Sequence, residues 1–528
     1  MNSPSLLTQI KRSSRMLALC GSALLLAACG SDDEIKHDTT VKLDHGGTIE
    51  GLWYNEEENG PREFLGIPYT EAPTGDLRFT PPQAASWEGS IDTQAFGPSC
   101  VQNPGALSAA GELSEDCLSL NVFTPALEEG EKDIPVMVWI HGGAFIAGGS
   151  NQYDAINLAK DKDVIVVTMN YRLGALGFFS HPDVDAELGE EQGNLGLQDQ
   201  QLALKWVNEN IEAFGGDKDN VTLFGESAGS MSVCTQMVAP GSQDYVDRFI
   251  LQSGVCVGGL PIIQKSSVEA ASTAMANDLC PDASDKIACL RSVTPEAVMA
   301  WGAGNGLFEN PWGATVIANG PILPDTPKNL IEAEQYNKGG IIIGTNANEW
   351  GLFQIIGAAP SVTTVDGLSD YIDAEYPSVI TGLIKNEYLP EDDAFANAAL
   401  SRLTTDVAFR CPARRLASLT QATGTDTWLY SFEQGLAFHA YEIPYVFNYV
   451  SAPLGIDPTE SPTKDVMQDY WTSFAYTGNP NNDDQPDWSN YDSASDEHMV
   501  IKDEPIASSN LAKSACDMWD AIAAASAQ

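Results

Sequence analysis

The segment "VTLFGESAGSMSV", residues 221–233, contains a serine between two glycines, the pattern G-x-S-x-G. A serine hydroxyl attacks a carbonyl only when a nearby base takes its proton and suitable donors stabilise the oxyanion that forms. Here "NVTLF" is typical of a buried strand and "SMSVCTQMV" of a helix, so Gly225 and Gly229 would allow a sharp turn that exposes Ser227. The hydroxyl would also lie at a helix N-terminus, which favours negative charge. We therefore predict that Ser227 is a nucleophile.

The base must be one of six histidines. In hydrolases with this turn the chain order is serine, acid, histidine, which leaves His439 and His498. His439 follows the strand-like segment "TWLYSF" within the loop "EQGLAFHAYEIPYVF". His498 lies in "DEHMVIKDEP", which we predict to be a strand, and we interpret it as a surface residue. We predict His439 as the base, and we expect activity to decline in mildly acidic solution as its imidazole is protonated.

The acid is expected just past a strand between the serine and the histidine. Glu349 meets this condition, because it lies in the loop "TNANEWG" after the apolar run "GGIIIG". Its carboxylate would hold the imidazole tautomer and stabilise the imidazolium. Asp325 and Asp406 are alternatives, and a solvated glutamate is the simpler interpretation in a chain with 73 acidic residues.

Backbone donors for the oxyanion are expected in "WIHGGAFIAGG". A strand that ends in a histidine and two glycines resembles the HGGG-type motif, whose glycines bring N–H groups close to a substrate carbonyl. The predicted oxyanion hole therefore comprises Gly142, Gly143 and Ala144, together with Ala228 directly after the serine. The donors would be the N–H groups of Gly143, Ala144 and Ala228, each worth about 3 kcal/mol in the transition state.

The elements that must position these residues are strands buried on both faces. Runs such as "IPVMVWI", "DVIVVTMN" and "RFILQSG" lack polar alternation, which is typical of a parallel sheet covered by helices. Further strands are predicted at 339–344 and 426–432, and a helix at 198–214. We predict an α/β fold with a large, mostly parallel central sheet flanked by helices. The segments 258–339 and 353–425 would be helical insertions that cover the active site.

Composition limits the partners. The 528 residues have 43% hydrophobic content, enough for one large domain or about three of ordinary size. The chain carries 27 basic and 73 acidic residues, a net charge of -46. Because this charge repels nucleic-acid phosphates and anionic membrane surfaces, we predict no nucleic-acid partner. It favours a neutral or cationic substrate and would also suit a high-salt environment.

The N-terminus is typical of an export signal. Three basic residues precede "MLALCGSALLLAA", an apolar run too short to span a bilayer. The following "LAAC" resembles the lipobox of bacterial lipoproteins, in which the cysteine, here Cys29, becomes a lipid-bearing N-terminus; cleavage without lipidation is the alternative. Gly30 indicates, by the same resemblance, transfer to the outer membrane. We predict a signal peptide at 1–28, a polar tether at 29–40 and a single catalytic domain at 41–528.

The cysteines after Cys29 are even in number, which in an exported chain favours disulfides over metal ligands. Short loops favour Cys100 with Cys117 and Cys280 with Cys289, each bond worth about 3 kcal/mol. The other pairings stay open at this point. No C-x-x-C and no histidines paired at helical spacing are present, so we predict no metal site and no cofactor.

Seven segments in this order resemble type B carboxylesterases, the branch of α/β hydrolases that includes cholinesterases and bile-salt-activated lipases. They are "FLGIPYTEAPTGDLRF", "SEDCLSLNVFTP", "WIHGGAF", "NYRLGALGFF", "GNLGLQDQQLALKWVNENIEAFGGD", "VTLFGESAG" and "AFHAYEIPYVF". The resemblance runs from about Gly51 to the C-terminus. It implies the α/β-hydrolase fold, ester hydrolysis and the triad Ser227, Glu349 and His439. Trp350 stands where the family usually has a glycine after the acid.

The resemblance also implies disulfides and pocket residues. It implies Cys100 with Cys117, Cys280 with Cys289 and Cys411 with Cys516, which leaves Cys234 with Cys256. Glu226 resembles a family residue near the active site. Cholinesterases carry a tryptophan in the loop between the first two cysteines, but "VQNPGALSAAGELSED" has no aromatic residue, which argues against a cation site of that kind. Trp312 is a candidate for the acyl side of an apolar pocket, with core packing as the alternative.

We therefore predict a cofactor-independent serine ester hydrolase that acts on small to medium, neutral, largely apolar esters. A lipase for longer acyl chains would use the same catalytic residues. A non-catalytic cell-surface binding protein would use the same fold without the chemistry. The sequence leaves the oligomeric state open, and it predicts a membrane contact only through an N-terminal lipid anchor.

Overall fold

The computed structural model describes residues 39–44, 47–56, 60–127, 132–258, 262–302, 310–312, 316–318, 320, 322–451 and 454–526. These residues belong to one unit, Asp38–Gln528. The predicted signal peptide, the candidate lipidation site Cys29 and the tether as far as residue 38 lie outside the described residues. Within the described residues, no helix is both long enough and apolar enough to cross a membrane.

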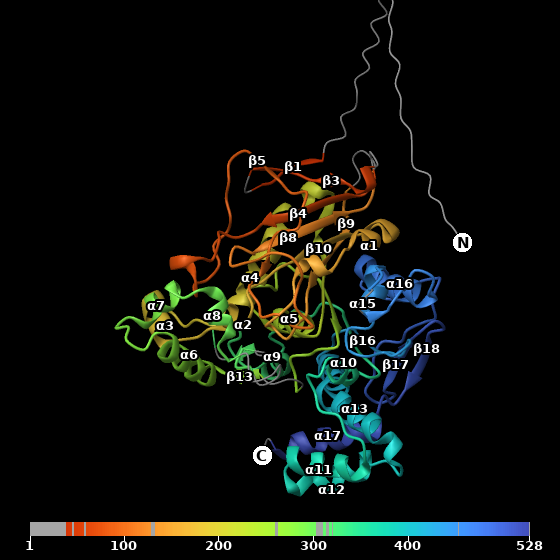
Figure 1. Ribbon diagram of the computed structural model, residues 1–528. Coiled ribbons are helices and arrows are strands. Elements are labelled where there is room, and N and C mark those ends of the chain that lie inside the picture. Colours follow the sequence, from red (N-terminus) through yellow and green to blue (C-terminus); the bar gives the residue numbers. More distant parts are fainter. Residues whose placement is uncertain are drawn as a thin grey trace, which may run out of the picture. The chain divides into compact units, whose positions relative to one another are not determined.

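A sheet of eleven strands forms the centre of the described part of the chain, in the order β18-β17-β16-β15-β12-β11-β9-β10-β8-β4-β3 (Figure 1). Its strands are β3 (Leu52–Trp53), β4 (Arg62–Pro68), β8 (Ser119–Thr124), β9 (Ile134–Ile140), β10 (Ile165–Met169), β11 (Gly216–Glu226), β12 (Arg248–Gln252), β15 (Ile341–Asn346), β16 (Thr427–Phe432), β17 (Glu497–Ile501) and β18 (Ile506–Ser509). Neighbours from β17 to β10 are parallel, whereas the pairs at both edges are antiparallel. The predicted fold class, a mostly parallel sheet in an α/β-hydrolase fold, is confirmed.

Smaller strands lie apart from this sheet. They are β1 (Thr40–Lys42), β2 (Thr48–Glu50) and β5 (Ser90–Asp92) in one sheet, β6 (Ser99–Cys100) with β7 (Leu113–Ser114), and β13 (Ile262–Gln264) with β14 (Val316–Ala318).

Helices surround the sheet. In the first half of the chain they are α1 (Ile156–Lys162), α2 (Gly174–Phe178), α3 (Pro182–Leu188), α4 (Leu195–Asn210), α5 (Ala228–Val238), α6 (Lys265–Leu279), α7 (Lys286–Ser292), α8 (Pro295–Ala300) and α9 (Pro327–Glu332). In the second half they are α10 (Trp350–Ile355), α11 (Val365–Glu375), α12 (Ser378–Tyr388), α13 (Ala396–Thr405), α14 (Cys411–Ala422), α15 (Ile443–Phe447), α16 (Pro462–Thr477) and α17 (Lys513–Ser526). A π-helical turn, η7 (Asp406–Arg410), joins α13 to α14. The helix predicted at 198–214 begins three residues earlier and ends in a 3₁₀ turn.

Alternate side chains of each central strand face two different apolar cores. In β9, Val138 packs in one core with residues of α4 and α5, whereas Trp139 packs in a second core with residues of α1 and α16. Every residue of β9, β10, β15 and β16 is buried. This burial on both faces explains why the strands read as continuous apolar runs.

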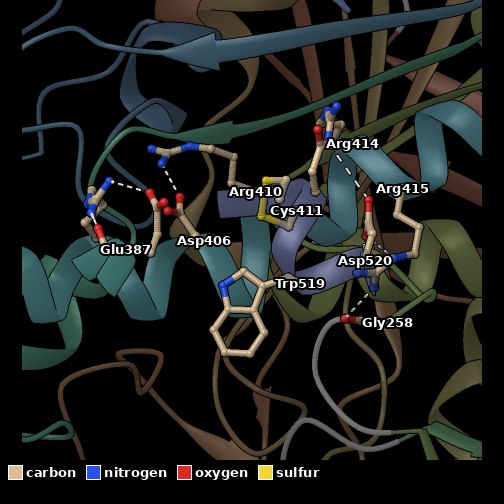
Figure 2. The surroundings of a disulfide bond; sticks show 12 residues. Gly258, Glu387, Asp406, Arg410, Cys411, Arg414, Arg415, Trp519 and Asp520 are labelled. Atoms are coloured by element: carbon tan, nitrogen blue, oxygen red, sulfur yellow. Dashed lines mark hydrogen bonds and ion pairs between the residues drawn. A yellow bond between two sulfur atoms is a disulfide. The ribbon is translucent and has the colours of Figure 1, made fainter. Parts of the chain in front are cut away.

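The predicted insertions are largely helical in the described residues, but the segment 258–339 also contains the short strands β13 and β14 beside α6 to α9. The segment 353–425 contributes α11, α12 and α13, which share a third apolar core with the C-terminal helix α17. A disulfide between Cys411 and Cys516 ties the start of α14 to α17, and Arg415 pairs with Asp520 beside it (Figure 2). The insertion is therefore bound to the end of the chain.

Four disulfides form in the described residues. They are Cys100 with Cys117, Cys234 with Cys256, Cys280 with Cys289, and Cys411 with Cys516. These are the pairs that the family resemblance implies, including the pair left over.

Candidate active site

Ser227 occupies a sharp turn between β11 and α5. Its backbone has φ 57° and ψ -123°, a conformation that residues other than glycine rarely adopt. Two glycines make this turn possible because the neighbouring chain is so close. A Cβ at Gly229 would lie 2.0 Å from the carbonyl oxygen of Ile140, and a Cβ at Gly225 would lie 2.7 Å from that oxygen. The Ser227 N–H donates to the carbonyl of Gln252 at 2.9 Å, which fixes the turn against β12.

The segment after β9 runs beside this serine, because β9 and β11 are parallel neighbours in the sheet. A Cβ built at Gly142 would lie 3.1 Å from the Cβ of Ser227 and 2.8 Å from the Glu226 carboxylate. Gly143 has φ 104° and Ala144 has φ 55°, so both residues are left-handed. The carbonyl of Gly143 accepts the N–H of Ala147 at 3.0 Å, which closes a tight turn. The four residues predicted for the oxyanion hole therefore lie on two segments that meet at Ser227.

His141 stabilises the base of that turn. Its ring stacks on Tyr171 with 4.4 Å between centroids, and its Nδ1 lies 2.8 Å from the carbonyl oxygen of Gly142. Because a carbonyl only accepts, Nδ1 carries the hydrogen. Burial lowers the pKa of His141 to about 4, although this hydrogen bond raises it. His141 is thus a neutral structural donor near neutral pH.

His439 and Glu349 form a short, buried pair. Nδ1 of His439 lies 2.7 Å from Oε2 of Glu349, and Oε1 of Glu349 accepts the N–H of Asn346 at 2.7 Å. The loops that carry them follow β15 and β16, which are parallel neighbours. They are joined by the N–H of Asn348, which donates to Ala437 at 2.9 Å, and by the N–H of His439, which donates to the Glu349 carbonyl at 3.3 Å. This arrangement holds one imidazole tautomer, with the hydrogen on Nδ1.

The His439 ring is surrounded by two aromatic rings and two carboxylates. Phe353 and Phe409 each lie 5.0 Å from its ring, centroid to centroid. Burial lowers the pKa of His439, but the carboxylates of Glu226 and Glu349 outweigh it and raise the pKa to about 9. The imidazole therefore loses its neutral form at a higher pH than the mildly acidic range expected from sequence.

Glu226, directly before the serine, is the second acidic neighbour. Its Oε1 lies 3.1 Å from Nε2 of His439, but the two atoms do not form a hydrogen bond. Burial raises the pKa of Glu226 to about 8, while His439 lowers it and Glu442 and Glu349 raise it further. Because each group favours the charge of the other, Glu226 and His439 titrate as a pair.

The sequence as a whole matches known esterases. Residues 37–519 match the model of the carboxylesterase family. Similar proteins include an acylcarnitine hydrolase of Mus musculus, 34% identical over 85% of each chain, and a cocaine esterase of Homo sapiens, 31% identical over 95% of this chain and 94% of that protein. Liver carboxylesterase 1 of Oryctolagus cuniculus is 31% identical over 90% of this chain and 92% of that protein.

The chain belongs to the carboxylesterase family. It is a carboxylic ester hydrolase that acts on small-molecule esters, so the predicted enzyme class is confirmed. The alternative of a non-catalytic binding protein is set aside by this match. In the part of this carboxylesterase that the structure describes, no group of three or more His, Cys, Asp or Glu side chains has the arrangement of a metal site.

Sequence reasoning missed a second layer of this carboxylesterase's site. Glu442 accepts from Asn346 Nδ2 at 2.6 Å and from Gln252 Nε2 at 3.2 Å, and Gln252 in turn accepts from Trp471 Nε1 at 3.0 Å. Burial raises the pKa of Glu442 to about 6, with Glu349 as a further cause. Its position three residues after His439, inside the segment "AFHAYEIPYVF", was the signal that could have identified it.

The rival site residues lie elsewhere. Asp325 accepts from Thr326 and Asn329 at the start of α9, and Asp406 pairs with Arg410.

His498 does lie in a strand, β17, but its interpretation as a surface residue is wrong: it is 5% exposed. The reason is that β17 is an internal strand of the sheet, between β16 and β18, and not a surface segment.

Trp312 is buried in the structure. Its ring lies 5.5 Å from that of Trp301, centroid to centroid, and its backbone N–H donates to Asn310 Oδ1 at 3.0 Å. The flanking segments 303–309 and 313–315 lie outside the described residues. The contacts that are described are those of core packing, the alternative raised from sequence.

Proposed function

We propose that this carboxylesterase cleaves its esters through the triad Ser227, His439 and Glu349 and a covalent acyl-enzyme. The observation that carries the proposal is the 2.7 Å contact between His439 Nδ1 and the buried Glu349 carboxylate. Both residues follow the C-terminal ends of parallel strands, at the end of the sheet where β11 leads into Ser227. Nε2 of His439 has no hydrogen-bond partner among the described residues, so in the neutral form of the imidazole it can accept the proton of the serine.

The first step forms a bond between Oγ of Ser227 and the ester carbonyl carbon. His439 Nε2 takes the hydroxyl proton as this bond forms, and the carbonyl oxygen becomes an oxyanion. The N–H groups of Gly143, Ala144 and Ala228 would donate to it, each worth about 3 kcal/mol. The carbon–oxygen bond to the alcohol then breaks, and the alcohol leaves with the proton from His439.

Water completes the cycle. His439 takes a proton from water as the hydroxide oxygen attacks the acyl carbon, and Ser227 leaves with that proton when the intermediate collapses. Glu349 stabilises the imidazolium in both halves of the reaction. Gly142 would allow this segment to lie close to the nucleophile, because a Cβ at this position would meet both Glu226 and Ser227.

The proposed substrates are small to medium, neutral, largely apolar esters. Phe353 and Phe409 against His439 provide apolar surface beside the reacting atoms. Glu226 would line the substrate-binding side of the site, and Trp312 would lie toward the acyl side of the pocket. A lipase for long acyl chains is the second candidate.

We also propose the location of the enzyme. Residues 1–28 would direct export, Cys29 would carry lipid, and residues 29–40 would tether the domain at 41–528 to the outer membrane. Four disulfides support export, because they persist in oxidising compartments. The intact mass of the mature protein tests this: lipidation adds acyl mass that Cys29→Ala abolishes, and an unmodified N-terminus contradicts it.

The nucleophile is tested with a fluorophosphonate and intact-mass analysis. Wild type should gain one phosphonyl group, whereas Ser227→Ala should gain none and lose about 10⁵-fold or more in kcat. Labelling that persists in the variant would place the nucleophile at another residue.

Chain-length preference is tested with p-nitrophenyl esters whose acyl groups run from about two to about sixteen carbons, compared by kcat/KM. We expect a maximum at short to medium chains. A maximum at the longest chains would favour the lipase.

A further inference from the structure

The loops that carry the acid and the base are joined to each other, and a third segment is hydrogen-bonded to the acid loop. Hydrogen bonds from Asn348 to Ala437 and from His439 to Glu349 join the two loops, and Asn346 Nδ2 donates to the Phe438 carbonyl at 2.7 Å. Neither loop belongs to a long helix or strand. Their position must therefore come from other side chains.

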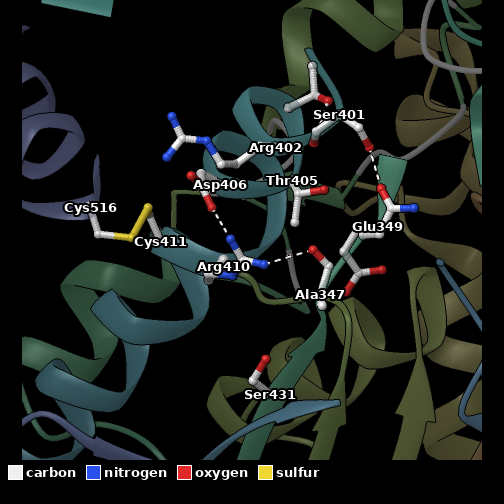
Figure 3. Close-up of polar contacts among 12 residues, drawn as sticks. Ala347, Glu349, Ser401, Arg402, Thr405, Asp406, Arg410, Cys411, Ser431 and Cys516 are labelled. Carbon is white, nitrogen blue, oxygen red and sulfur yellow. Dashed lines mark hydrogen bonds and ion pairs between the residues drawn. A yellow bond between two sulfur atoms is a disulfide. The ribbon is translucent and has the colours of Figure 1, made fainter. Parts of the chain in front are cut away.

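The segment from Ser401 to Arg410 supplies three polar contacts to the acid loop. Ser401 Oγ donates to Asn348 Oδ1 at 2.5 Å, and the N–H of Trp350 donates to Thr405 Oγ1 at 3.3 Å. Arg410 Nη2 donates to the Ala347 carbonyl at 2.9 Å. Figure 3 shows Arg410 extended between Asp406 and Ala347, two residues before Glu349.

Arg410 is itself held firmly. It is 9% exposed and pairs with Asp406, whose other oxygen accepts from Tyr388 at 3.0 Å. Both residues lie in the π-helical turn η7, a form that often marks functional sites. The next residue, Cys411, is bound to α17 through its disulfide. The Arg410 side chain is thus fixed by its ion pair with Asp406, and its backbone is fixed by the disulfide at the next residue.

The same turn also touches the base. Phe409, adjacent to Arg410, packs on the His439 ring at 5.0 Å. Movement of η7 would therefore displace both the Glu349 loop and the imidazole.

We propose that Arg410 is a positioning residue, which fixes the Glu349 loop so that its carboxylate meets His439 Nδ1. This inference rests on the triad of the proposed function. Arg410 makes no contact with the reacting atoms in the described residues; it acts through the Ala347 carbonyl. Loss of that contact should misplace Glu349, and displacements of about 1 Å can cost about 100-fold in rate. The substitution removes no side chain of the proposed substrate pocket, so KM should change little compared with kcat.

The matched control is Arg415. Its guanidinium also bridges a carboxylate and a backbone carbonyl, Asp520 at 2.6 Å and Gly258 at 3.4 Å, but Figure 2 shows it on the other side of the disulfide from Arg410. A purely structural loss in this region should appear equally in Arg410→Gln and Arg415→Gln.

The experiment compares kcat, KM, Tm and the rate of fluorophosphonate labelling in full-length wild type, Arg410→Gln, Arg410→Lys and Arg415→Gln. We expect Arg410→Gln to lose about 10- to 100-fold in kcat and in labelling rate, with KM within about twofold. Arg410→Lys keeps a cation for Asp406 and should recover part of this loss. Arg415→Gln should lower Tm without changing kcat.

Two results would overturn the inference: full kcat in folded Arg410→Gln, or an equal loss of kcat in Arg415→Gln. If Arg410→Gln does not fold, Arg410→Lys decides, because wild-type kcat in that variant together with an unchanged labelling rate contradicts the role. Failure of the triad itself is recognised separately, by labelling that survives Ser227→Ala.

Discussion

The two halves of the candidate active site are built in different ways. The nucleophile half is one continuous piece of chain, β11, the turn at Ser227 and α5, and its backbone conformation follows from close approach to Ile140. The acid–base half joins Glu349 and His439, 90 positions apart, through side chains and loop backbone. Its supports come from a third segment, Ser401 to Arg410.

This difference predicts where each half is sensitive. In the nucleophile half, and in the segment after β9 that lies beside it, an added Cβ is damaging, because glycines permit the close backbone contacts there. In the acid–base half, loss of a hydrogen-bonding side chain is damaging, including one remote from the reaction. The predictions below separate the two.

The largest effect is expected from Glu349→Gln. The amide oxygen can still accept from Asn346, which turns the amide NH₂ toward His439 Nδ1 and forces the hydrogen onto Nε2, the wrong tautomer for a base. We expect kcat to fall about 10⁴-fold with little change in Tm. Glu433→Gln, an exposed glutamate after β16, is the control and should keep wild-type kcat. A loss of less than about tenfold in Glu349→Gln would mean that another carboxylate orients the imidazole.

A smaller effect is expected from Gly143→Ala. The new Cβ would lie 2.2 Å from the Ala147 carbonyl oxygen at a φ of 104°, so the turn that aims the N–H groups must shift. We expect a loss of about 10²- to 10³-fold in kcat. Ala144→Gly is the matched control: glycine accepts the φ of 55° there and keeps the N–H, so kcat should remain within about threefold. Equal activities in the two variants would place the oxyanion donors elsewhere.

The smallest effect is a shift in pH dependence in Glu226→Gln. The Glu226 carboxylate raises the pKa of His439 more than any other single charge, so its removal lowers that pKa. The neutral imidazole then persists to lower pH, and the acidic limb of kcat/KM against pH moves to lower pH. Glu442→Gln should move the limb less, because Glu442 is the weakest of the three carboxylate influences on His439. A shift to higher pH in Glu226→Gln would refute this electrostatic account.

The serine turn and the central strands could be predicted from local sequence patterns. The turn at Ser227 could be inferred because two glycines, a buried strand and a helix are contiguous, and each constrains its neighbours sterically. The central strands could be inferred because burial on both faces leaves no polar positions in their sequences. The family resemblance then singled out Glu349 among many acidic residues.

Some buried polar residues escaped prediction, including Glu442, which lies within the quoted segment "AFHAYEIPYVF". Glu442 and Gln252 look like ordinary polar side chains in the sequence, yet they are buried and hydrogen-bonded behind the triad. His498 reads as a surface residue because acidic neighbours surround it, but β17 is an internal strand of the sheet, between β16 and β18. Burial depends on which strands become neighbours, and local polarity does not report that.

By itself, the amino-acid sequence determined the α/β class, the strained serine turn and the enzyme family, because each depends on residues adjacent in the chain or on motifs in a set order. Only the tertiary structure decided how the acid meets the base and what holds them. Glu349, His439 and Arg410 come together because β15 and β16 align in parallel and the turn η7 packs across their ends. Such contacts arise from the packing of distant segments, whose energy no local pattern encodes.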